Sequence, residues 1–177
     1  MANVRSLSDN GVMAWRASTP DDHDRIATLM LALYAEDPAP IAPTREGGLA
    51  TLAVLEQQPL RGVAVVHEPA GGRSREASDT TARELDGYAL LCSFWSNELG
   101  GEVCIIDELY VAPSARGRGL ATALVTGLLR RELPWFERAV NVELEVTADN
   151  ARARALYERL GFRPYENALM RARRTTA

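Results

Sequence analysis

Residues 107–122 read Asp107-Glu108-Leu109-Tyr110-Val111-Ala112-Pro113-Ser114-Ala115-Arg116-Gly117-Arg118-Gly119-Leu120-Ala121-Thr122. The order is an apolar strand, a basic turn that carries two glycines, and the start of an apolar helix. Gly117 and Gly119 allow the backbone to approach a ligand closely, and Arg116 and Arg118 add positive charge. The first N–H groups of a helix have no partner inside it, and the helix dipole is positive there. The segment therefore predicts a binding site for a phosphate-bearing ligand, above all a diphosphate.

The composition is that of a globular domain, because 46% of the 177 residues are hydrophobic. We expect residues 1–177 to form a single domain, with residues 1–10 as a candidate disordered end. The chain shows no apolar run of bilayer length and no signal-peptide core at its start, which favours a cytoplasmic protein away from membranes. Cys92 and Cys104 lie in apolar segments, as buried free thiols in a reducing compartment do. The two histidines stand at no zinc-ligand spacing from a cysteine, so we expect no metal site.

The charged residues exclude some functions. All twenty basic residues are arginine, so the chain has no lysine for a Walker loop or for any lysine-based mechanism. The net charge of −4 disfavours nucleic acid as the main partner, because binding to phosphates needs an excess of basic groups. We interpret the arginines near the C-terminus, Arg171, Arg173 and Arg174, as solvated side chains.

Apolar periodicity and the positions of Pro and Gly predict alternating strands and helices. We expect strands over residues 12–17, 61–67, 87–96, 102–111, 140–146 and 162–171. We expect helices from Pro20 behind an N-cap Thr19, from Arg45 or Gly48 to Gln57, from Leu120 to Leu133 before Pro134, and from Ala151 to Leu160 behind an N-cap Asn150. Residues 68–86 have no periodicity and many Gly, Ser, Thr and charged residues, which predicts a long loop insertion.

The turn at residues 97–101 joins two of these strands in a hairpin. If Asn97 pairs with Glu102, then Trp95 faces Cys104, and Cys92 faces Asp107. A slip of one residue would reverse every facing, so the register is the weakest element of the prediction.

Gly117-Arg118-Gly119-Leu120-Ala121-Thr122 also suggests a dinucleotide-binding turn. Thr122 stands where that fingerprint has its third glycine, and five residues separate the strand from the turn. The surrounding hairpin is antiparallel, whereas the dinucleotide fold needs a βαβ unit. These features disfavour a dinucleotide.

Two blocks of sequence carry a resemblance to a known family. They are Leu109-Tyr110-Val111…Arg116-Gly117-Arg118-Gly119-Leu120-Ala121 and Asn150…Ala155-Leu156-Tyr157…Leu160-Gly161-Phe162. Their order and separation resemble the signature of the GNAT N-acetyltransferase superfamily, whose cofactor loop has Arg or Gln, two residues, Gly, one residue, and Gly or Ala. The resemblance extends to residues 13–37, and only residues 68–86 look particular to this chain. It implies an α/β fold with a mixed, mostly antiparallel twisted sheet of about six to seven strands and about four helices.

The resemblance also implies acetyl-CoA as cosubstrate, with no metal. The loop and helix start, Arg116, Gly117, Arg118, Gly119, Leu120, Ala121 and Thr122, would hold the pyrophosphate through backbone N–H groups. The pantetheine arm would pair with the backbone of Leu109, Tyr110 and Val111, where an N–H near Leu109 or Val111 polarises the acetyl carbonyl. The Tyr110 side chain would point to the other face. Asn150 would bond the amides of the arm or order the loop.

Catalysis by direct transfer needs an amine without its proton, and a carboxylate can remove that proton. Asp107 and Glu108 stand where several relatives keep an acidic base, and Asp107 is preferred because alternation places it with Leu109 and Val111. The alternative interpretation is that both are ordinary strand charges paired with nearby arginines or water. Tyr157 stands where the family often keeps a tyrosine general acid for the departing thiolate, although an aromatic packed between helix and sheet would look the same.

The acceptor is the open part of this prediction. In the family the first helices and their connection build the acceptor pocket, so Glu36 and Asp37 would join Asp107 and Glu108 in an acidic site. Such a site suits a cationic amine, for example a polyamine, an aminoglycoside or a basic peptide end. The alternative function is a catalytically silent acyl-CoA-binding sensor on the same fold, which sequence does not distinguish from an enzyme. The family also makes a homodimer an expected assembly.

Overall fold

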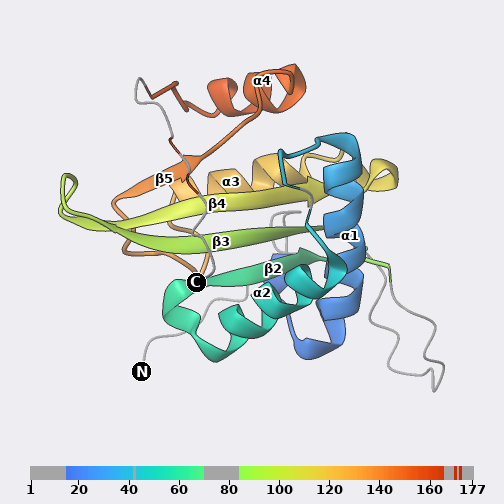
Figure 1. Cartoon of the computed structure of the whole chain (residues 1–177). Coiled ribbons are helices and arrows are strands. Elements are labelled where there is room, and N and C mark those ends of the chain that lie inside the picture. The colour runs from blue at the N-terminus through green and yellow to red at the C-terminus, as the bar shows by residue number, and fades with distance from the viewer. Residues whose placement is uncertain (1–14, 42, 70–83, 166–169, 171, 173–177) are drawn as a thin grey trace, which may run out of the picture.

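A computed structural model describes residues 15–41, 43–69, 84–165, 170 and 172. Within these residues five strands form one sheet in chain order (Figure 1): β1 (Trp15–Ala17), β2 (Gly62–His67), β3 (Gly87–Ser96), β4 (Gly101–Val111) and β5 (Asn141–Leu144). Strands β1 to β4 are antiparallel, and β5 is parallel to β4. The mixed, mostly antiparallel sheet is thus confirmed, whereas the described residues form five strands and not the expected six to seven. The expected last strand and the start of the first fall partly outside the described residues, as does most of the loop insertion and all of residues 1–10.

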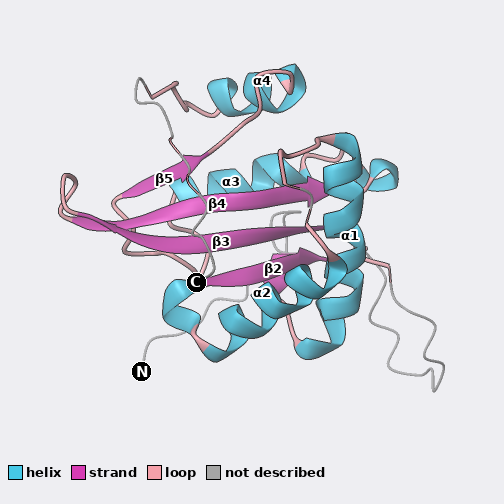
Figure 2. Ribbon diagram, in the orientation of Figure 1, coloured by secondary structure: helices cyan, strands magenta, loops and turns pink. Residues whose placement is uncertain are grey.

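In the described part of the chain, four α-helices flank the sheet (Figure 2). They are α1 (His23–Glu36), α2 (Arg45–Gln57), α3 (Leu120–Leu129) and α4 (Ala151–Arg159). Helices α1 and α2 pack on one face, α3 packs on the other, and α4 lies beyond β5. Short 3-10 turns at Pro20–Asp22, Pro59–Arg61 and Pro113–Ala115 precede α1, β2 and α3. No helix in the described ranges is long and apolar enough to cross a membrane.

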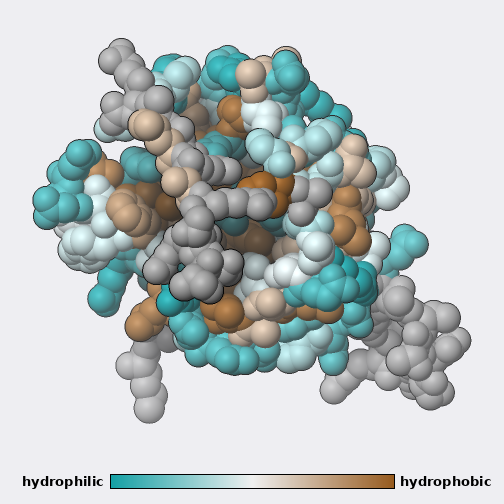
Figure 3. Space-filling model, viewed as in Figure 1, coloured by the Kyte–Doolittle hydropathy of each residue, from teal (hydrophilic) through white to brown (hydrophobic). Residues whose placement is uncertain are grey.

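Each face of the sheet has its own hydrophobic core. Ile26, Leu52 and Tyr88 are among the buried residues between α1, α2 and the sheet. Leu91 and Leu124 belong to the core under α3. On the side of α1 and α2, hydrophilic residues dominate the lower rim of the surface, and hydrophobic residues lie in its hollows (Figure 3). Strand β4 lies between the two cores, so its carboxyl end is packed on both faces of the sheet.

The β3–β4 hairpin has a different register from the expected one. Trp95 pairs with Glu102, and Cys92 pairs with Ile105, because the turn begins after Ser96. The expected register was therefore wrong by two residues. A shift of two keeps each side chain on its expected face of the sheet.

A β-bulge at Asp107 changes the facing of the rest of β4. Leu91 pairs with Ile106 but Leu90 pairs with Glu108, so the register shifts by one residue at Asp107. Ile106 and Leu109 consequently both pack on the α3 side, although they are three positions apart in the strand. Strict alternation, on which the preference for Asp107 as base depended, does not hold across the bulge.

Helix α3 ends at Leu129, four residues before the predicted end at Leu133. Arg131 adopts a left-handed backbone with φ of 58°. Its N–H donates to Leu128 O (3.1 Å), and the N–H of Glu132 donates to Gly127 O (2.9 Å). This pattern is a Schellman C-cap, formed here without the usual glycine, and it ends the helix before Pro134 is reached.

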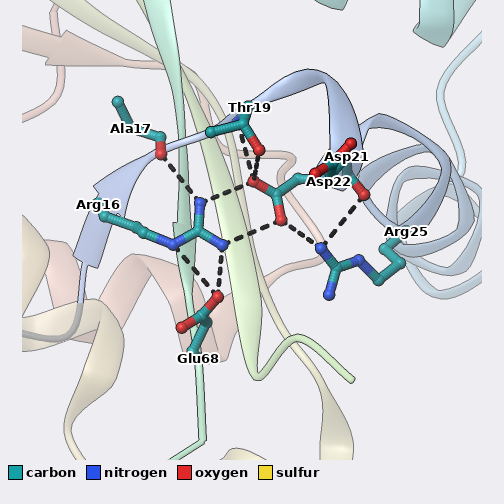
Figure 4. Close-up of polar contacts among 7 residues, drawn as sticks. All are labelled: Arg16, Ala17, Thr19, Asp21, Asp22, Arg25 and Glu68. Atoms are coloured by element: carbon teal, nitrogen blue, oxygen red, sulfur yellow. Dashed lines mark hydrogen bonds and ion pairs between the residues drawn. The ribbon is translucent and has the colours of Figure 1, made fainter. Parts of the chain in front are cut away.

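The start of α1 is held by an ionic cluster around the buried Asp22 (Figure 4). The Asp22 side chain is 1% exposed and accepts hydrogen bonds from two nitrogens of Arg16 (2.7 and 3.0 Å) and from the Thr19 N–H (2.8 Å). Arg25 also donates to Asp22, and Arg16 donates to Glu68. The cluster ties β1, the first turn of α1 and the segment after β2 together. The helix predicted from Pro20 therefore begins with a 3-10 turn, and α1 starts at His23.

Candidate active site

A cleft of about 930 Å³ opens beside the carboxyl end of β4. Its walls come from the end of α1, the end of β4, the turn and first residues of α3, and the inner face of α4. Every predicted cofactor residue except Arg118 lines it. Among the lining residues are Leu109, Tyr110, Val111, Arg116, Gly117, Gly119, Leu120, Ala121, Thr122, Asn150 and Tyr157.

The turn before α3, called the cradle below, has the backbone geometry that the prediction of an anion site requires. Gly117 and Gly119 have φ of 81° and 79°, a left-handed conformation that favours glycine. A Cβ at either position would meet no atom within 4 Å, so both face open space. The first helical bond of α3 runs from Ala123 N–H to Gly119 O (2.8 Å), which leaves the N–H groups of residues 120–122 without helical partners. These N–H groups and the helix dipole make this end of the cleft attractive to phosphate.

Among the residues that the structure describes, no strand pairs with the outer edge of β4 next to this cradle. Strand β5 pairs with β4 only over Val103–Ile106. The Ala112 N–H donates to Asp86 O on the β3 side (2.8 Å), and hydrogen-bonded pairs alternate along an antiparallel ladder. The backbone N–H groups of Leu109 and Val111 therefore point away from β3, toward the open edge. An extended ligand can pair with this edge as an added strand would.

Asn150 begins α4 and also contacts α1. Its Oδ1 accepts a hydrogen bond from the Ala153 N–H (3.0 Å), so it is the N-cap that the sequence predicted. Its Nδ2 donates to Asp37 (2.8 Å), which follows the last residue of α1. Asn150 thus orders the wall of the cleft.

The acidic residues at the end of α1 are engaged with the cleft walls. Glu36 accepts hydrogen bonds from the Tyr110 hydroxyl (2.7 Å) and from Arg116 (2.7 and 2.9 Å). The Tyr110 hydroxyl, followed by the Arg116 guanidinium, lowers the pKa of Glu36 against the effect of burial. Tyr110 packs in the core under α1, on the face opposite to Leu109, as alternation predicted.

Glu108 is held by two tyrosines that the sequence analysis missed. Its two carboxylate oxygens accept hydrogen bonds from the hydroxyls of Tyr34 and Tyr88, each at 2.7 Å. Burial raises the pKa of Glu108, the two tyrosine bonds lower it, and Asp107 raises it further, with a net increase. Asp107 itself is exposed in the bulge. Both carboxylates lie on β4 just before Leu109, although neither lines the cleft.

Tyr157 projects from α4 into the cleft. Its ring packs against Phe162 at 5.7 Å between centroids in an edge arrangement. Burial raises the pKa of Tyr157, so its hydroxyl stays protonated at neutral pH. The residue therefore packs as an aromatic and also presents a hydroxyl that can donate a proton.

A second set of residues missed by the sequence analysis connects β1 and β2 to the cradle and the first residue of α3. The Trp15 indole donates to the carbonyl of Leu120 (3.2 Å) and packs edge-on against the His67 ring at 5.4 Å. His67 Nδ1 lies 3.2 Å from Asp86 Oδ2. Arg118 lies 3.9 Å from the same carboxylate, outside the cleft lining. No local motif marks these contacts, because they join segments far apart in the chain.

Comparison with known proteins identifies the architecture. Residues 71–162, which are 92 of the 177, match the model of the Acetyltransferase (GNAT) family. The chain belongs to the GNAT acetyltransferase family. The resemblance seen in the two sequence blocks is thereby confirmed, and GNAT proteins use acetyl-CoA for acetyl transfer.

Curated relatives match part of this GNAT chain. It is 43% identical over 76 residues to a mycothiol acetyltransferase of Beutenbergia cavernae, a match that spans 43% of this chain and 25% of that protein. It is 39% identical over 75 residues to an uncharacterized N-acetyltransferase of Methanocaldococcus jannaschii, over 42% of this chain and 32% of that protein. The matches thus span about a third or less of the length of these relatives.

Solved structures resemble the GNAT chain over nearly its whole length. A protein of Clostridium difficile 630 described as a possible acetyltransferase has a TM-score of 0.70 and 18% identity, over 92% of this chain and 97% of that one. A ribosomal-protein-alanine N-acetyltransferase of Brucella melitensis has a TM-score of 0.64 and 19% identity, over 89% and 98%. At these identities the likeness establishes the fold alone.

Proposed function

We propose that this GNAT protein transfers the acetyl group of acetyl-CoA to a primary amine of a small molecule or peptide, by direct attack in a ternary complex. The observation that carries the proposal is that two surfaces of one cleft continue into a third surface just outside it. The cradle before α3 suits the pyrophosphate, the open edge of β4 suits the amide-bearing arm, and the bulge with its two carboxylates lies at the far end of that edge. Bulges often occur next to active sites, where they redirect side chains.

The roles of the residues follow from this placement. The N–H groups of Leu120, Ala121 and Thr122 bind the pyrophosphate, and those of Leu109 and Val111 face the arm and the thioester carbonyl. A carboxylate at the bulge takes the proton from the ammonium, directly or through a water. The amine nitrogen then forms its bond to the acetyl carbon as the carbon–sulfur bond breaks.

Glu108 fits the role of base better than Asp107. Its burial favours proton uptake, and Tyr34 and Tyr88 fix its orientation. Asp107 stays the competing candidate, because it lies in the bulge itself.

The acceptor is proposed to be cationic, although with fewer acids than the sequence suggested. Arg116 neutralises Glu36, and Asp37 is bonded to Thr147 and Asn150. Asp107 and Glu108 therefore carry the acidic character of the proposed acceptor site. Polyamines, aminoglycosides and peptides with free N-termini, including N-terminal alanine, form the panel to test.

The decisive experiment follows the release of CoA thiol from acetyl-CoA in the presence of each amine, with mass spectrometry of the product. A mass gain of one acetyl group on an amine, in step with thiol release, supports the enzyme. Tight binding of acetyl-CoA without transfer to any amine of the panel would favour the alternative, a silent acyl-CoA sensor on the same fold.

Tyr157 is proposed as the general acid that protonates the departing thiolate. Replacement of Tyr157 by Phe keeps the ring contact with Phe162 and removes only the hydroxyl. We expect kcat to fall by about 100-fold, with little change in the thermal midpoint. Steady-state kinetics at saturating acetyl-CoA measure the effect. An unchanged kcat would remove Tyr157 from the mechanism.

A further inference from the structure

Glu36, the last residue of α1, holds the side chain of Arg116, the first residue of the cradle. Arg116 donates through one terminal nitrogen to both carboxylate oxygens of Glu36, at 2.7 and 2.9 Å. Its Nε donates to the carbonyl of Val111 (2.9 Å), and its guanidinium lies 5.4 Å from the centre of the Tyr110 ring. A carboxylate, a backbone carbonyl and an aromatic ring therefore hold this guanidinium. The end of α1 is thus attached to the wall of the cleft made by β4 and the cradle.

Asp37, the next residue, contacts the opposite wall. Its carboxylate accepts hydrogen bonds from the Thr147 hydroxyl (2.8 and 3.1 Å) and from the Asn150 side-chain amide (2.8 Å). Thr147 and Asn150 lie in the segment that leads from β5 to α4. Two successive residues thus connect the two walls, and Pro38, which also lines the cleft, restricts the chain that follows.

We propose that Glu36 and Asp37 are positioning residues that hold the two walls of the acetyl-CoA cleft at a fixed separation, and that they do not bind the acceptor. The inference rests on the proposed function, because it assumes that the cleft takes acetyl-CoA. A site held in its binding geometry loses less conformational freedom when the ligand enters, and its affinity is higher for that reason. Loss of either acid would let the walls separate, at a cost in affinity for acetyl-CoA.

A competing account makes the opposite prediction. If the Arg116 guanidinium were itself a ligand of the pyrophosphate, Glu36 would compete with the phosphate for it. Removal of the Glu36 charge would then tighten the binding of acetyl-CoA. If Glu36 positions the cradle instead, the same substitution weakens binding. The sign of the change in Kd therefore separates the two accounts.

The test measures Kd for acetyl-CoA by isothermal titration calorimetry with the full chain and its Glu36→Gln and Asp37→Asn variants. We expect each substitution to raise Kd about tenfold, as the loss of hydrogen bonds to a charged group does. Turnover at saturating acetyl-CoA and amine should change much less than Kd, which a general loss of structure would not produce. Glu46→Gln is the matched control, because Glu46 is exposed on the first turn of α2, and its Kd should equal that of the wild type.

A double variant distinguishes positioning from unrelated damage. If Glu36 acts through Arg116, the double variant Glu36→Gln/Arg116→Gln should bind acetyl-CoA no more weakly than the weaker-binding of its two single variants, Glu36→Gln and Arg116→Gln. If Glu36→Gln and Asp37→Asn both bind acetyl-CoA as tightly as the wild type or more tightly, the inference is overturned. Failure of the wild type itself to bind acetyl-CoA overturns the proposed function, and that result is seen before any variant is compared.

Discussion

Replacement of Glu108 by glutamine is expected to lower kcat for acetyl transfer by about 100-fold or more, the usual range for loss of a general base. The carboxylate is the group that accepts the ammonium proton, and the amide that replaces it is not basic. Tyr34 and Tyr88 donate to Glu108 at 2.7 Å each, and a glutamine of the same size occupies the same space. The KM for acetyl-CoA should therefore change little, because Glu108 lies outside the cofactor cleft.

The pH dependence of kcat/KM tests the same role of Glu108 as the base. Burial raises the pKa of Glu108 above its ordinary value of 4.5. A base must be ionised to act, so activity should fall as the pH decreases through this raised pKa. We expect the wild type to show this acidic limb above pH 4.5, and the Glu108→Gln variant to lose it.

Asp107→Asn is the matched control for this prediction, since it changes the neighbouring carboxylate in the same way. We expect a much smaller loss of kcat, because Asp107 is exposed and lies at the bulge. If Asp107→Asn abolishes the acidic limb and Glu108→Gln keeps it, the base is Asp107. If both variants keep full turnover, neither carboxylate is the base.

Replacement of Asp22 by asparagine is expected to lower the free energy of unfolding by about 3 kcal/mol, the low end of the cost of breaking a buried ion pair. The Asp22 side chain is 1% exposed and accepts bonds from Arg16, Arg25 and the Thr19 N–H. Asparagine removes the charge that both arginines pair with and leaves them close together. Chemical denaturation at neutral pH measures the loss.

The contribution of Asp22 should depend on pH in a defined direction. Burial raises its pKa, but the hydrogen bonds from Arg16 and Thr19 outweigh burial and lower the pKa from 3.8 to about 2. A lowered folded-state pKa stabilises the protein at a pH above the unfolded value, and this stabilisation is lost as the pH falls. The difference in unfolding free energy between wild type and Asp22→Asn should therefore be constant above about pH 4 and shrink toward pH 2.

Asp24→Asn is a control for the charge change alone. Asp24 pairs with Arg45, but its side chain is 79% exposed, so the pair contributes about 0.5 kcal/mol or less. Equal destabilisation by Asp22→Asn and Asp24→Asn would contradict the structural role given to the ionic cluster around Asp22.

Sequence reasoning succeeded where the signal is local. The strand, glycine turn and helix of residues 107–122 follow from residues next to one another, and Gly117 and Gly119 do have positive φ. The Asn150 side chain caps α4, as the sequence predicted. Helix α2 begins at Arg45, the earlier of the two predicted starts, behind a Thr44 cap that the sequence analysis did not name. Each of these features is decided within a few residues.

Sequence reasoning failed where the structure depends on distant contacts. The bulge at Asp107 has no Gly or Pro to mark it, so the sequence analysis assumed strict alternation along the whole strand. The bond from Asn150 to Asp37 crosses 113 residues, and that from Arg116 to Glu36 crosses 80. Without these contacts the acids of α1 looked like acceptor ligands.

Amide hydrogen exchange with and without saturating acetyl-CoA tests the central claim most directly, because the claim concerns backbone N–H groups. We expect exchange at Leu109, Val111 and residues 120–122 to slow by about tenfold or more when acetyl-CoA is bound. Amides of β2, which lies away from the cleft, should be unaffected and serve as the internal control. Unchanged exchange at Leu109 and at residues 120–122 in a protein saturated with acetyl-CoA would contradict the proposed site.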